Sequence, residues 1–341
     1  MPVTLKVRLI GISRPVICTV LGRALILTAA VSVSLPAAGQ EATGYPSRPV
    51  RIVIGFTPGG VPDITARTIA AKLTESWKQQ VIVDNRPGAG GTIAAQIVAS
   101  ANPDGHTLLS VSNAHSVAPA IYAKLPYDTV KDFAGITMTA SGPALLLVSP
   151  TIGVKSAKDL IALAKAKPGQ LNFSSAGVGS GTHFGGELFK ARAGIDVVHI
   201  PFKGIPEAIT ETMAGRVQFF LSPLASAIGL VKDGKVPAVG VTSLQRIPQL
   251  PDIPTVGESG LPGFQWAYWY GMLAPAKIPR PVLARLNNEI TGILNQPDVR
   301  SRWIAMGADP APSTSQAFDK FIAEDIATLT KIARAANIKA Q

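Results

Sequence analysis

The stretch that decides the fold of this chain is Ile52-Val-Ile-Gly-Phe-Thr-Pro-Gly-Gly-Val-Pro-Asp-Ile-Thr-Ala-Arg67. Its apolar start, Ile52 to Phe56, predicts a buried strand. The glycines at Gly59 and Gly60 predict a sharp turn whose backbone can come close to a ligand. A helix is expected next, with Asp63 as its N-terminal cap. Its apolar face is expected to consist of Ala66, Ile69, Ala70, Leu73 and Trp77.

This order of strand, turn and helix indicates an anion site at the start of the helix. Backbone N–H groups at such a position attract negative charge without any basic side chain. The alternative is an ordinary strand-to-helix connection that binds nothing. Asp63 is expected mainly as the helix cap, although a cap that also orders the turn would serve both purposes.

A second glycine-rich turn, from Ser174 to His183, has the same setting. It follows an expected strand ending at Asn172 and Phe173, and an expected helix at 184–193 comes after it. Ligands of α/β folds sit beyond the carboxyl ends of the strands, where both turns fall. His183 begins the helix, so it is either a ligand contact or a structural hydrogen-bond partner.

The whole chain alternates strands with helices, which predicts an α/β fold with parallel sheets covered on both faces. Further strands are expected at 81–83, 107–111, 145–148, 197–200, 217–221 and 236–241, and further helices at 92–100, 206–214 and beyond Pro275. The 341 residues are 47% hydrophobic and 16% charged, which suits two domains better than one.

The first 40 residues are predicted to be a cleaved secretory signal peptide. Four basic residues precede an apolar stretch from Ala24 to Leu35, and small residues follow it. A retained membrane anchor is the alternative, but about a dozen apolar residues are short for a membrane span. The only cysteine, Cys18, would be removed with this segment. The mature chain is therefore expected to have no disulfides and no thiol chemistry.

The charge pattern argues against nucleic acid as a partner. The formal net charge is +11, and removing the four basic residues of the signal segment leaves +7. The remaining basic residues are dispersed, without a Lys/Arg run or a zinc or helix-turn-helix pattern. A mildly basic exported protein is instead expected to favour small anions.

Known enzyme motifs are missing from the sequence. Ser180 has Val178 two positions before it, so the nucleophile motif Gly-x-Ser-x-Gly fails. Thr182 stands where the dinucleotide motif that starts at Gly177 requires glycine or alanine, and no Gly-Lys-Ser/Thr occurs. The four histidines do not have metal-ligand spacing. No cofactor and no metal are expected, although a constellation assembled only by folding stays open.

Several sequence blocks occur in a characteristic order along the mature chain: Phe56-Thr-Pro-Gly-Gly-Val-Pro-Asp63, Val83-Asp-Asn-Arg-Pro-Gly-Ala-Gly-Gly91, Asp104-Gly-His-Thr-Leu108, Ser174-Ser-Ala-Gly-Val-Gly-Ser180, His199-Ile-Pro-Phe-Lys-Gly204, Pro251-Asp-Ile-Pro-Thr255 and Trp269-Tyr-Gly271. Together they resemble the Bug-type extracytoplasmic solute receptors, the substrate-binding proteins of tripartite tricarboxylate transporters. The resemblance covers essentially the whole mature chain.

This resemblance implies a two-lobed periplasmic binding protein of type II-like α/β fold that closes on its ligand. Lobe 1 would comprise residues 45–143 and 264–341, and lobe 2 would comprise residues 144–263. Two crossing segments, near 144–148 and 265–271, would join the lobes. The implied ligand is a small organic carboxylate, and the implied partner is a membrane permease. The protein is expected to act in the periplasm as a monomer.

The resemblance also implies the ligand-binding residues, which fall in the two turns and after the strand at 197–200: Phe56, Pro58, Gly59, Gly60, Asp63, Ser174, Ser175, Ala176, Gly177, Gly179, Ser180, Thr182, His183, Phe202 and Lys203. Phe202 departs from the family, which often has a tyrosine there, and Ser222-Pro223 replaces a frequent acidic or amide residue. These departures favour plain carboxylates, including aromatic ones, over amino acids. Lys203 either meets an anion or is solvated.

Three alternatives stay open. The first is an exported hydrolase or lyase that uses His183 or His199 with a serine such as Ser180, although His199 is expected mainly as a strand residue. The second is a receptor that feeds a sensor instead of a permease. The third is an anchored interaction module that retains its signal segment.

Overall fold

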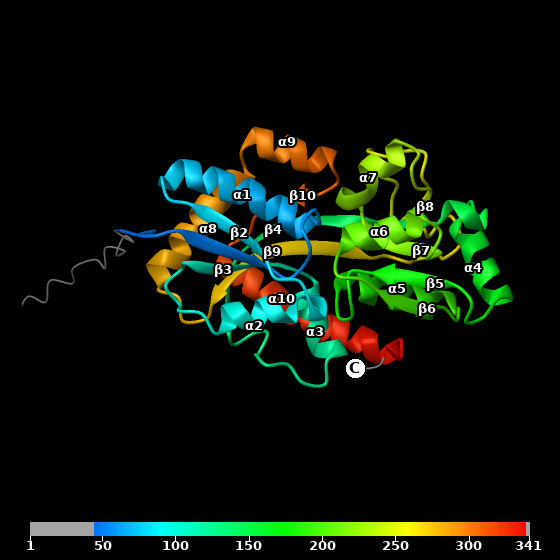
Figure 1. The fold of residues 1–341 in the computed structure, drawn as a ribbon, viewed down its shortest axis with the longest axis horizontal. Coiled ribbons are helices and arrows are strands. Elements are labelled where there is room, and N and C mark those ends of the chain that lie inside the picture. Colours follow the sequence, from blue (N-terminus) through cyan, green and yellow to red (C-terminus); the bar gives the residue numbers. More distant parts are fainter. Residues whose placement is uncertain (1–43, 339–341) are drawn as a thin grey trace, which may run out of the picture. The chain divides into compact units, whose positions relative to one another are not determined.

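The computed structural model describes residues 44–338. The expected signal segment therefore lies outside the described residues. Within them, no helix is both long and apolar enough to cross a membrane. The fold divides into two lobes, whose sheets share one long strand (Figure 1).

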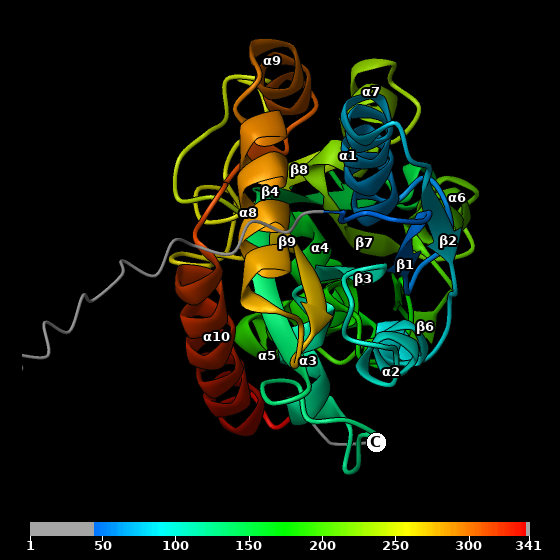
Figure 2. The ribbon, with the colours of Figure 1, turned by 90° about the vertical axis from the view of Figure 1, so that its left-hand side faces the viewer.

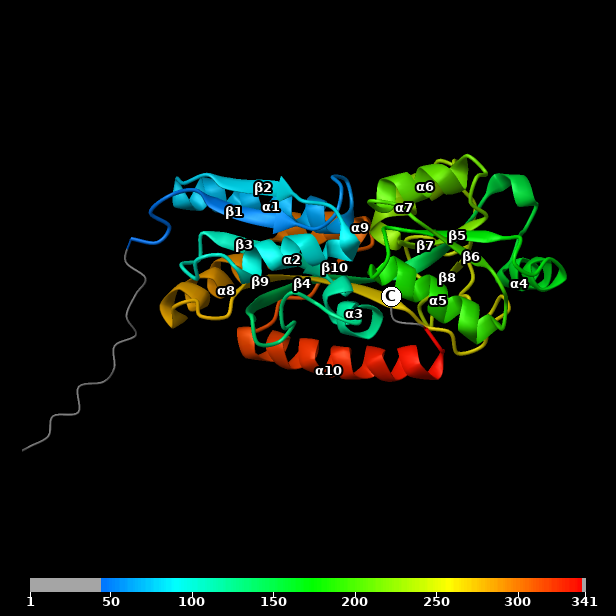
Figure 3. The ribbon, with the colours of Figure 1, turned by 60° about the horizontal axis from the view of Figure 1, so that its bottom comes forward.

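The first lobe is built from β1 to β3 with the chain's C-terminal helices. Its elements are β1 (Val50–Ile54), α1 (Val61–Trp77), β2 (Val81–Asn85), the short 3-10 turn η1 (Ala89–Gly91), α2 (Thr92–Ala99), β3 (Thr107–Ser112), α3 (Ala114–Ile121), α8 (Arg280–Leu294), α9 (Pro297–Ala305), β10 (Asp309–Pro310) and α10 (Ser315–Ala335). Helices α1 and α8 cover one face of this sheet and α2 the other (Figure 2). Figure 3 shows α3 and α10 packed side by side.

The second lobe repeats the strand–helix order. Its elements are η2 (Pro150–Ile152), α4 (Ala157–Ala166), β5 (Asn172–Ser175), α5 (Gly181–Ala193), β6 (Val198–Pro201), α6 (Ile205–Met213), β7 (Phe219–Pro223), α7 (Leu224–Lys232) and β8 (Ala238–Val241). Parallel pairing joins β5 to β6 and to β7, as it joins β1 to β2 and to β3 in the first lobe.

Two long strands run between the lobes, β4 (Phe133–Val148) and β9 (Ala267–Pro275). The strand order is β2-β1-β3-β9-β4-β7-β5-β6, with β8 and β10 also paired to β4. Both long strands pair antiparallel with their neighbours. The sheets therefore contain both parallel and antiparallel pairs, whereas repeated strand–helix units predict parallel pairs alone. The antiparallel pairs arise because β4 and β9 connect the lobes and run opposite to the strands beside them.

Alternating side chains anchor both faces of each sheet. In β1, Ile52 and Ile54 pack toward α1 and α8, whereas Val53 packs toward α2 and α10. In β4, Leu146 and Leu147 face opposite sides in the same way. Strand side chains alternate between faces, so a continuous apolar run is what a sheet covered by helices on both sides requires. This packing holds the loop that follows each parallel strand at one edge of its sheet.

Candidate functional site

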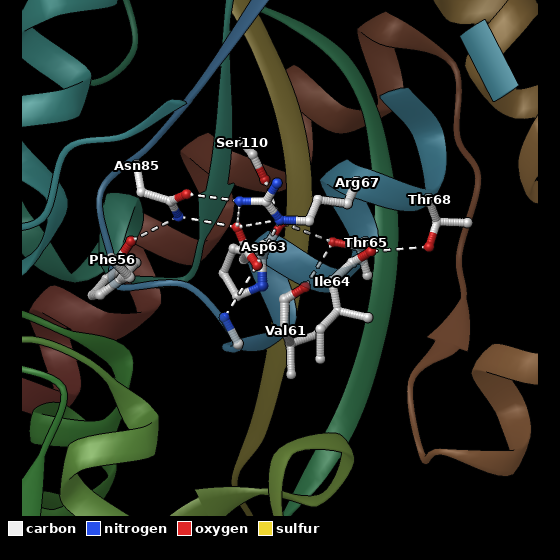
Figure 4. A network of polar contacts seen from close by, with 11 residues as sticks. Phe56, Val61, Asp63, Ile64, Thr65, Arg67, Thr68, Asn85 and Ser110 are labelled. Atoms are coloured by element: carbon white, nitrogen blue, oxygen red, sulfur yellow. Dashed lines mark hydrogen bonds and ion pairs between the residues drawn. The ribbon is translucent and has the colours of Figure 1, made fainter. Parts of the chain in front are cut away.

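The first glycine turn is ordered by the carboxylate of Asp63. Asp63 does not cap α1 as predicted, because Gly60 is the capping residue and Asp63 is the third residue of the helix. Its carboxylate instead accepts hydrogen bonds from the N–H of Gly59 at 3.1 Å and from the side chains of Arg67 and Asn85 at 3.0 Å each (Figure 4). Asn85 also donates to the carbonyl of Phe56 at 3.1 Å, so the turn is tied to the neighbouring strand.

Asp63 stays ionised although it is buried. Burial acts to raise the pKa of its carboxyl, but the hydrogen bonds from Arg67, from the Gly59 N–H and from Asn85 outweigh burial and hold this pKa below its ordinary value. Gly59 has a φ of +89°, a conformation that favours glycine, so the residue type is set by the turn.

The start of α1 leaves backbone donors free. The N–H groups of Gly60 and Val61 have no hydrogen-bond partner among the described residues. Helices begin with unpaired N–H groups and carry partial positive charge at that end. The start of α1 therefore has the free donors that the predicted anion site requires.

The second glycine turn presents α5 in the same manner. Ser180 caps α5 by accepting the N–H of His183 at 3.1 Å, and the hydroxyl of Thr182 accepts the N–H of Ala176 at 2.8 Å. The N–H groups of Gly181 and Thr182 have no hydrogen-bond partner in residues 44–338. The side chains of this turn thus order it, and two backbone donors remain.

A cavity lies between the two turns. Its empty volume is about 360 Å3, its opening to solvent included. Five helices begin at this cavity: α1 at Gly60, α3 at Asn113, α5 at Ser180, α6 at Ile205 and α7 at Pro223. None of the lining residues carries a charge. The positive ends of these helices are therefore the source of any attraction for an anion.

Two polar side chains of the lining are buried without a partner. Asn113 is 2% exposed and Tyr270 is 3% exposed. Neither Asn113 Oδ1 nor Tyr270 Oη has a hydrogen-bond partner among the described residues. Buried polar groups are nearly always hydrogen-bonded, so such a pair at a cavity indicates a place for a ligand group.

The structure brings five of the fifteen predicted site residues to this cavity: Phe56, Gly60, Ala176, Ser180 and Thr182. The other ten do not line it: Pro58, Gly59, Asp63, Ser174, Ser175, Gly177, Gly179, His183, Phe202 and Lys203. Most of these support the turns. Ser174 bonds the carbonyl of Ala208, and the Phe202 N–H bonds the carbonyl of Ser175, whereas Lys203 is exposed.

His183 and His199 form a stacked pair behind the second turn, with ring centroids 4.1 Å apart. His183 Nδ1 accepts the N–H of Gly179 at 3.3 Å, and His199 Nε2 shares a 2.6 Å hydrogen bond with Ser175. Burial, helped by the nearby Lys190, lowers the pKa of His183 to about 4. Burial, with His183 and Lys190, lowers the pKa of His199 to about 3. Both rings are therefore neutral at pH 7.

Sequence reasoning missed eight of the thirteen residues that line the cavity: Pro62, Ser112, Asn113, Gly181, Ile205, Pro223, Tyr268 and Tyr270. Tyr270 belongs to a cluster of aromatic residues at 266–270, whose spacing does not show which ring lines the cavity. Asn113 had a usable signal, because it directly follows the buried strand β3. Residues 44–338 contain no group of three or more His, Cys, Asp or Glu side chains placed to hold a metal ion.

The family of the chain follows from comparison with known proteins. The model of the tripartite tricarboxylate transporter family receptor matches residues 65–338. The chain belongs to this receptor family. The resemblance to Bug-type solute receptors is thereby confirmed, and BugT of Bordetella pertussis is 32% identical over 305 residues, 89% of this chain and 94% of that protein.

A second relative, a UPF0065 protein in the tcbD-tcbE intergenic region of Pseudomonas sp. (strain P51), is 41% identical over 261 residues, 76% of this chain and 78% of that protein. Two solved structures have bound ligands. R. palustris Rpa4515 with adipate has a TM-score of 0.84 at 32% identity and covers 87% of this chain and 100% of its own. MatC from Rhodopseudomonas palustris with malate has a TM-score of 0.81 at 33% identity, with coverages of 84% and 99%. The two-lobed fold expected for the receptor family is confirmed.

Proposed function

We propose that this protein is a periplasmic receptor that captures a small organic carboxylate in the cavity between its lobes and delivers it to the permease of a tripartite tricarboxylate transporter. The observation that carries this proposal is the convergence of five helix starts on a cavity with no charged lining residue. The adipate and malate bound by two relatives support a carboxylate as the ligand.

The free backbone donors account for carboxylate binding. In this proposal one carboxylate lies between the N–H groups of Gly60 and Val61 from α1 and those of Gly181 and Thr182 from α5. Hydrogen bonds to an ionised acceptor are shorter and stronger than neutral ones, and water exclusion strengthens them further. Because the donors come from both lobes, an anion between them favours the closed state.

The receptor performs no chemistry on its ligand. Ser180 bonds the main-chain N–H of His183 and the hydroxyl of Thr182, so it has no imidazole base in hydrogen-bond contact. Ser175 does bond His199, but it is fully buried and does not line the cavity. A nucleophile needs a base and access to the substrate, and neither serine combines the two.

The N–H of Val61 offers a direct test of the carboxylate site. Proline is tolerated at the first position of a helix, where it removes only an unpaired N–H. Gly60 already has the extended conformation that a following proline requires, with ψ of 165°. We expect Val61→Pro to weaken binding of the best carboxylate by about tenfold or more, since a hydrogen bond to a charged group is lost.

Val61→Ala is the matched control, because it also shortens this buried side chain but keeps the N–H. It should lower the free energy of unfolding by about 1 to 2 kcal/mol and leave the affinity close to native. The ligand for these titrations comes from a thermal-shift screen of mono-, di- and tricarboxylates, with amino acids for comparison. Equal affinities for Val61→Pro and Val61→Ala would remove α1 from the site, and a screen in which no carboxylate stabilises the protein would refute the proposed function.

A further inference from the structure

The cavity contains a neutral polar pair in addition to its anion-binding helix starts. Asn113 and Tyr270 are the two buried side chains that line it and present polar atoms without a hydrogen-bond partner in residues 44–338. The other tyrosine of the lining, Tyr268, donates its hydroxyl to the carbonyl of Leu221 at 2.7 Å and is satisfied. The Tyr268 hydroxyl hydrogen is therefore not available to a ligand, unlike the polar atoms of Asn113 and Tyr270.

The pair sits on the first lobe at the junction of two strands. The N–H of Asn113 donates to the carbonyl of Trp269 at 3.1 Å, and Ser112 is paired with Tyr270 in the β3–β9 ladder. Tyr270 thus pairs with the residue directly before Asn113, and main-chain hydrogen bonds hold both backbones at the edge of the cavity.

The second lobe closes tightly over Asn113. A Cβ atom at Gly181, the first residue of α5, would lie only 2.1 Å from Asn113 Oδ1. The amide of Asn113 therefore faces the start of α5, whose N–H groups are proposed to hold the carboxylate. A ligand that reaches the helix start is therefore close to Asn113, and Tyr270 lines the same cavity.

The chemistry of the pair selects a particular ligand group. Asn113 Oδ1 is an acceptor that needs a donor, and the Tyr270 hydroxyl stays protonated because burial raises the pKa of this phenol well above its ordinary value. A hydroxyl group can donate to the first and accept from the second at once. A second carboxylate cannot donate to Asn113, and the apolar remainder of the lining, including Phe56, Pro62 and Ile205, does not balance a second charge.

We propose that the ligand is a hydroxylated carboxylic acid, whose hydroxyl is recognised between Asn113 Oδ1 and the Tyr270 hydroxyl while its carboxylate is held at the helix starts. This inference rests on the proposed function and names the substrate class of the same site. Asn113 and Tyr270 are specificity-determining residues that separate the hydroxy acid from the acid of the same skeleton. A site built to bond a hydroxyl leaves its own polar groups unpaired when the hydroxyl is missing.

Calorimetric titration with matched acids tests this inference. The pairs are butanoate with 3-hydroxybutanoate, succinate with malate, and benzoate with 4-hydroxybenzoate, each titrated into the full mature protein. We expect the hydroxy acid of at least one pair to bind about tenfold or more tightly than its partner. In Tyr270→Phe, which loses only the phenol oxygen, and in Asn113→Ala, this ratio should fall toward one while binding of the plain acid is retained.

Tyr45→Phe is the matched control for the tyrosine change. This change also removes a buried hydroxyl, which donates to the carbonyl of Gly105 at 2.7 Å, but Tyr45 does not line the cavity. Its stability should drop and its selectivity ratio should stay native. The inference is overturned if plain acids bind as well as hydroxy acids in every pair, or if Tyr270→Phe and Asn113→Ala weaken both acids equally. Binding of plain acids alone leaves the proposed function standing, whereas failure of all six acids, together with a thermal-shift screen in which no other carboxylate stabilises the protein, removes both.

Discussion

At the scale of single residues, Asp63 does more for the site than a helix cap would. Its carboxylate joins Gly59, Arg67 and Asn85, and so fixes the turn in which the free N–H groups of α1 begin. In the proposed function Asp63 therefore supports the carboxylate site through the backbone, without touching the ligand. The hydrogen bonds that lower the pKa of Asp63 also make the stability of the turn depend on pH, because they require the ionised carboxylate.

We predict that Asp63→Asn lowers the free energy of unfolding by about 1 to 2 kcal/mol at pH 7, because bonds to a charged group are replaced by weaker neutral ones and Arg67 is half exposed. The lowered pKa means that the carboxylate stabilises the fold above its ordinary pKa of 3.8, and that this contribution is lost as pH falls through the folded value. Urea denaturation at pH 7 and pH 3.5 should show the difference shrinking at the lower pH.

The control is Asp252→Asn, because Asp252 is exposed and has no hydrogen bond or ion pair in the described part of the chain. This change should leave the free energy of unfolding unchanged at both pH 7 and pH 3.5. A deficit of Asp63→Asn that is the same at both pH values would mean that the charge of Asp63 is not what stabilises the turn.

At the scale of elements, the start of α5 depends on buried neutral histidines. His183 closes the second turn through its Nδ1, and His199 supports it from β6 by stacking and by its bond to Ser175. Protonation would place positive charge at a helix start that already carries partial positive charge. Acid therefore acts against the same element that the proposed function uses to bind an anion.

We predict that stability falls as pH is lowered from about 6.5 to about 4. Folded His183 titrates at about 4 and folded His199 at about 3, whereas the unfolded chain binds protons near the ordinary 6.5. The unfolded state thus binds more protons in this window, and each histidine adds a slope of up to about 1.4 kcal/mol per pH unit. Burial lowers the pKa of His115 to about 4 as well, so His115 adds to the slope. His199→Gln should lower the slope of the free energy of unfolding against pH by the contribution of one proton. Chemical denaturation between pH 4 and 7 measures this slope.

Ser156→Ala separates this effect from ordinary destabilisation. Ser156 caps α4 by accepting the N–H of Asp159 at 3.1 Å, so its loss should cost about 1 kcal/mol at every pH in the window. A native slope in His199→Gln would show that His199 is already protonated in the folded protein.

The elements also mark how far local sequence patterns reach. The strands that precede both glycine turns were predictable, because each is specified by neighbouring residues. Helix α3 was missed because it is only eight residues long and contains Pro119, and the strand β9 was hidden in an aromatic cluster. Asn113 caps α3, and Tyr268 and Tyr270 lie on β9, so these two elements account for three of the eight cavity residues that were missed.

The cavity itself could not be derived from spacing. Asn113 and Tyr270 are adjacent only because β3 pairs with β9, and Gly181 meets Asn113 only because the lobes come together. Such contacts depend on packing between segments that are far apart in the chain, and no periodicity records them. The proposed binding chemistry nevertheless follows from the sequence, since a glycine turn before a helix offers backbone donors wherever it lies.

At the scale of the whole molecule, contacts between the lobes surround the cavity. Tyr122 donates to the carbonyl of Val178 at 2.7 Å, and Thr57 donates to Glu207 at 3.0 Å. Gly90, in the η1 turn of the first lobe, packs so closely on the second that a Cβ there would lie 2.3 Å from the Val178 oxygen. In the proposed function these contacts belong to the closed state that a bound ligand favours.

We predict that Gly90→Ala weakens binding of the best carboxylate by about tenfold or more, although Gly90 does not line the cavity described above. The added methyl group meets backbone and not a flexible side chain, so the lobes must separate to admit it. A ligand then has to offset this strain, and its apparent affinity falls with the fraction of closed protein. Calorimetry measures the affinity, and small-angle scattering with ligand should report a larger radius of gyration than for the native protein.

Gly153→Ala isolates the steric part of this effect. Gly153 has φ of +68°, close to the +61° of Gly90, but a Cβ there has nothing within 4 Å. Both variants therefore carry the same left-handed backbone strain, about 1 kcal/mol of stability. Only Gly90→Ala should lose affinity, because only its methyl group lies between the lobes. If both variants bind as tightly as the native protein, the lobe contact at Gly90 is not part of the ligand-bound state.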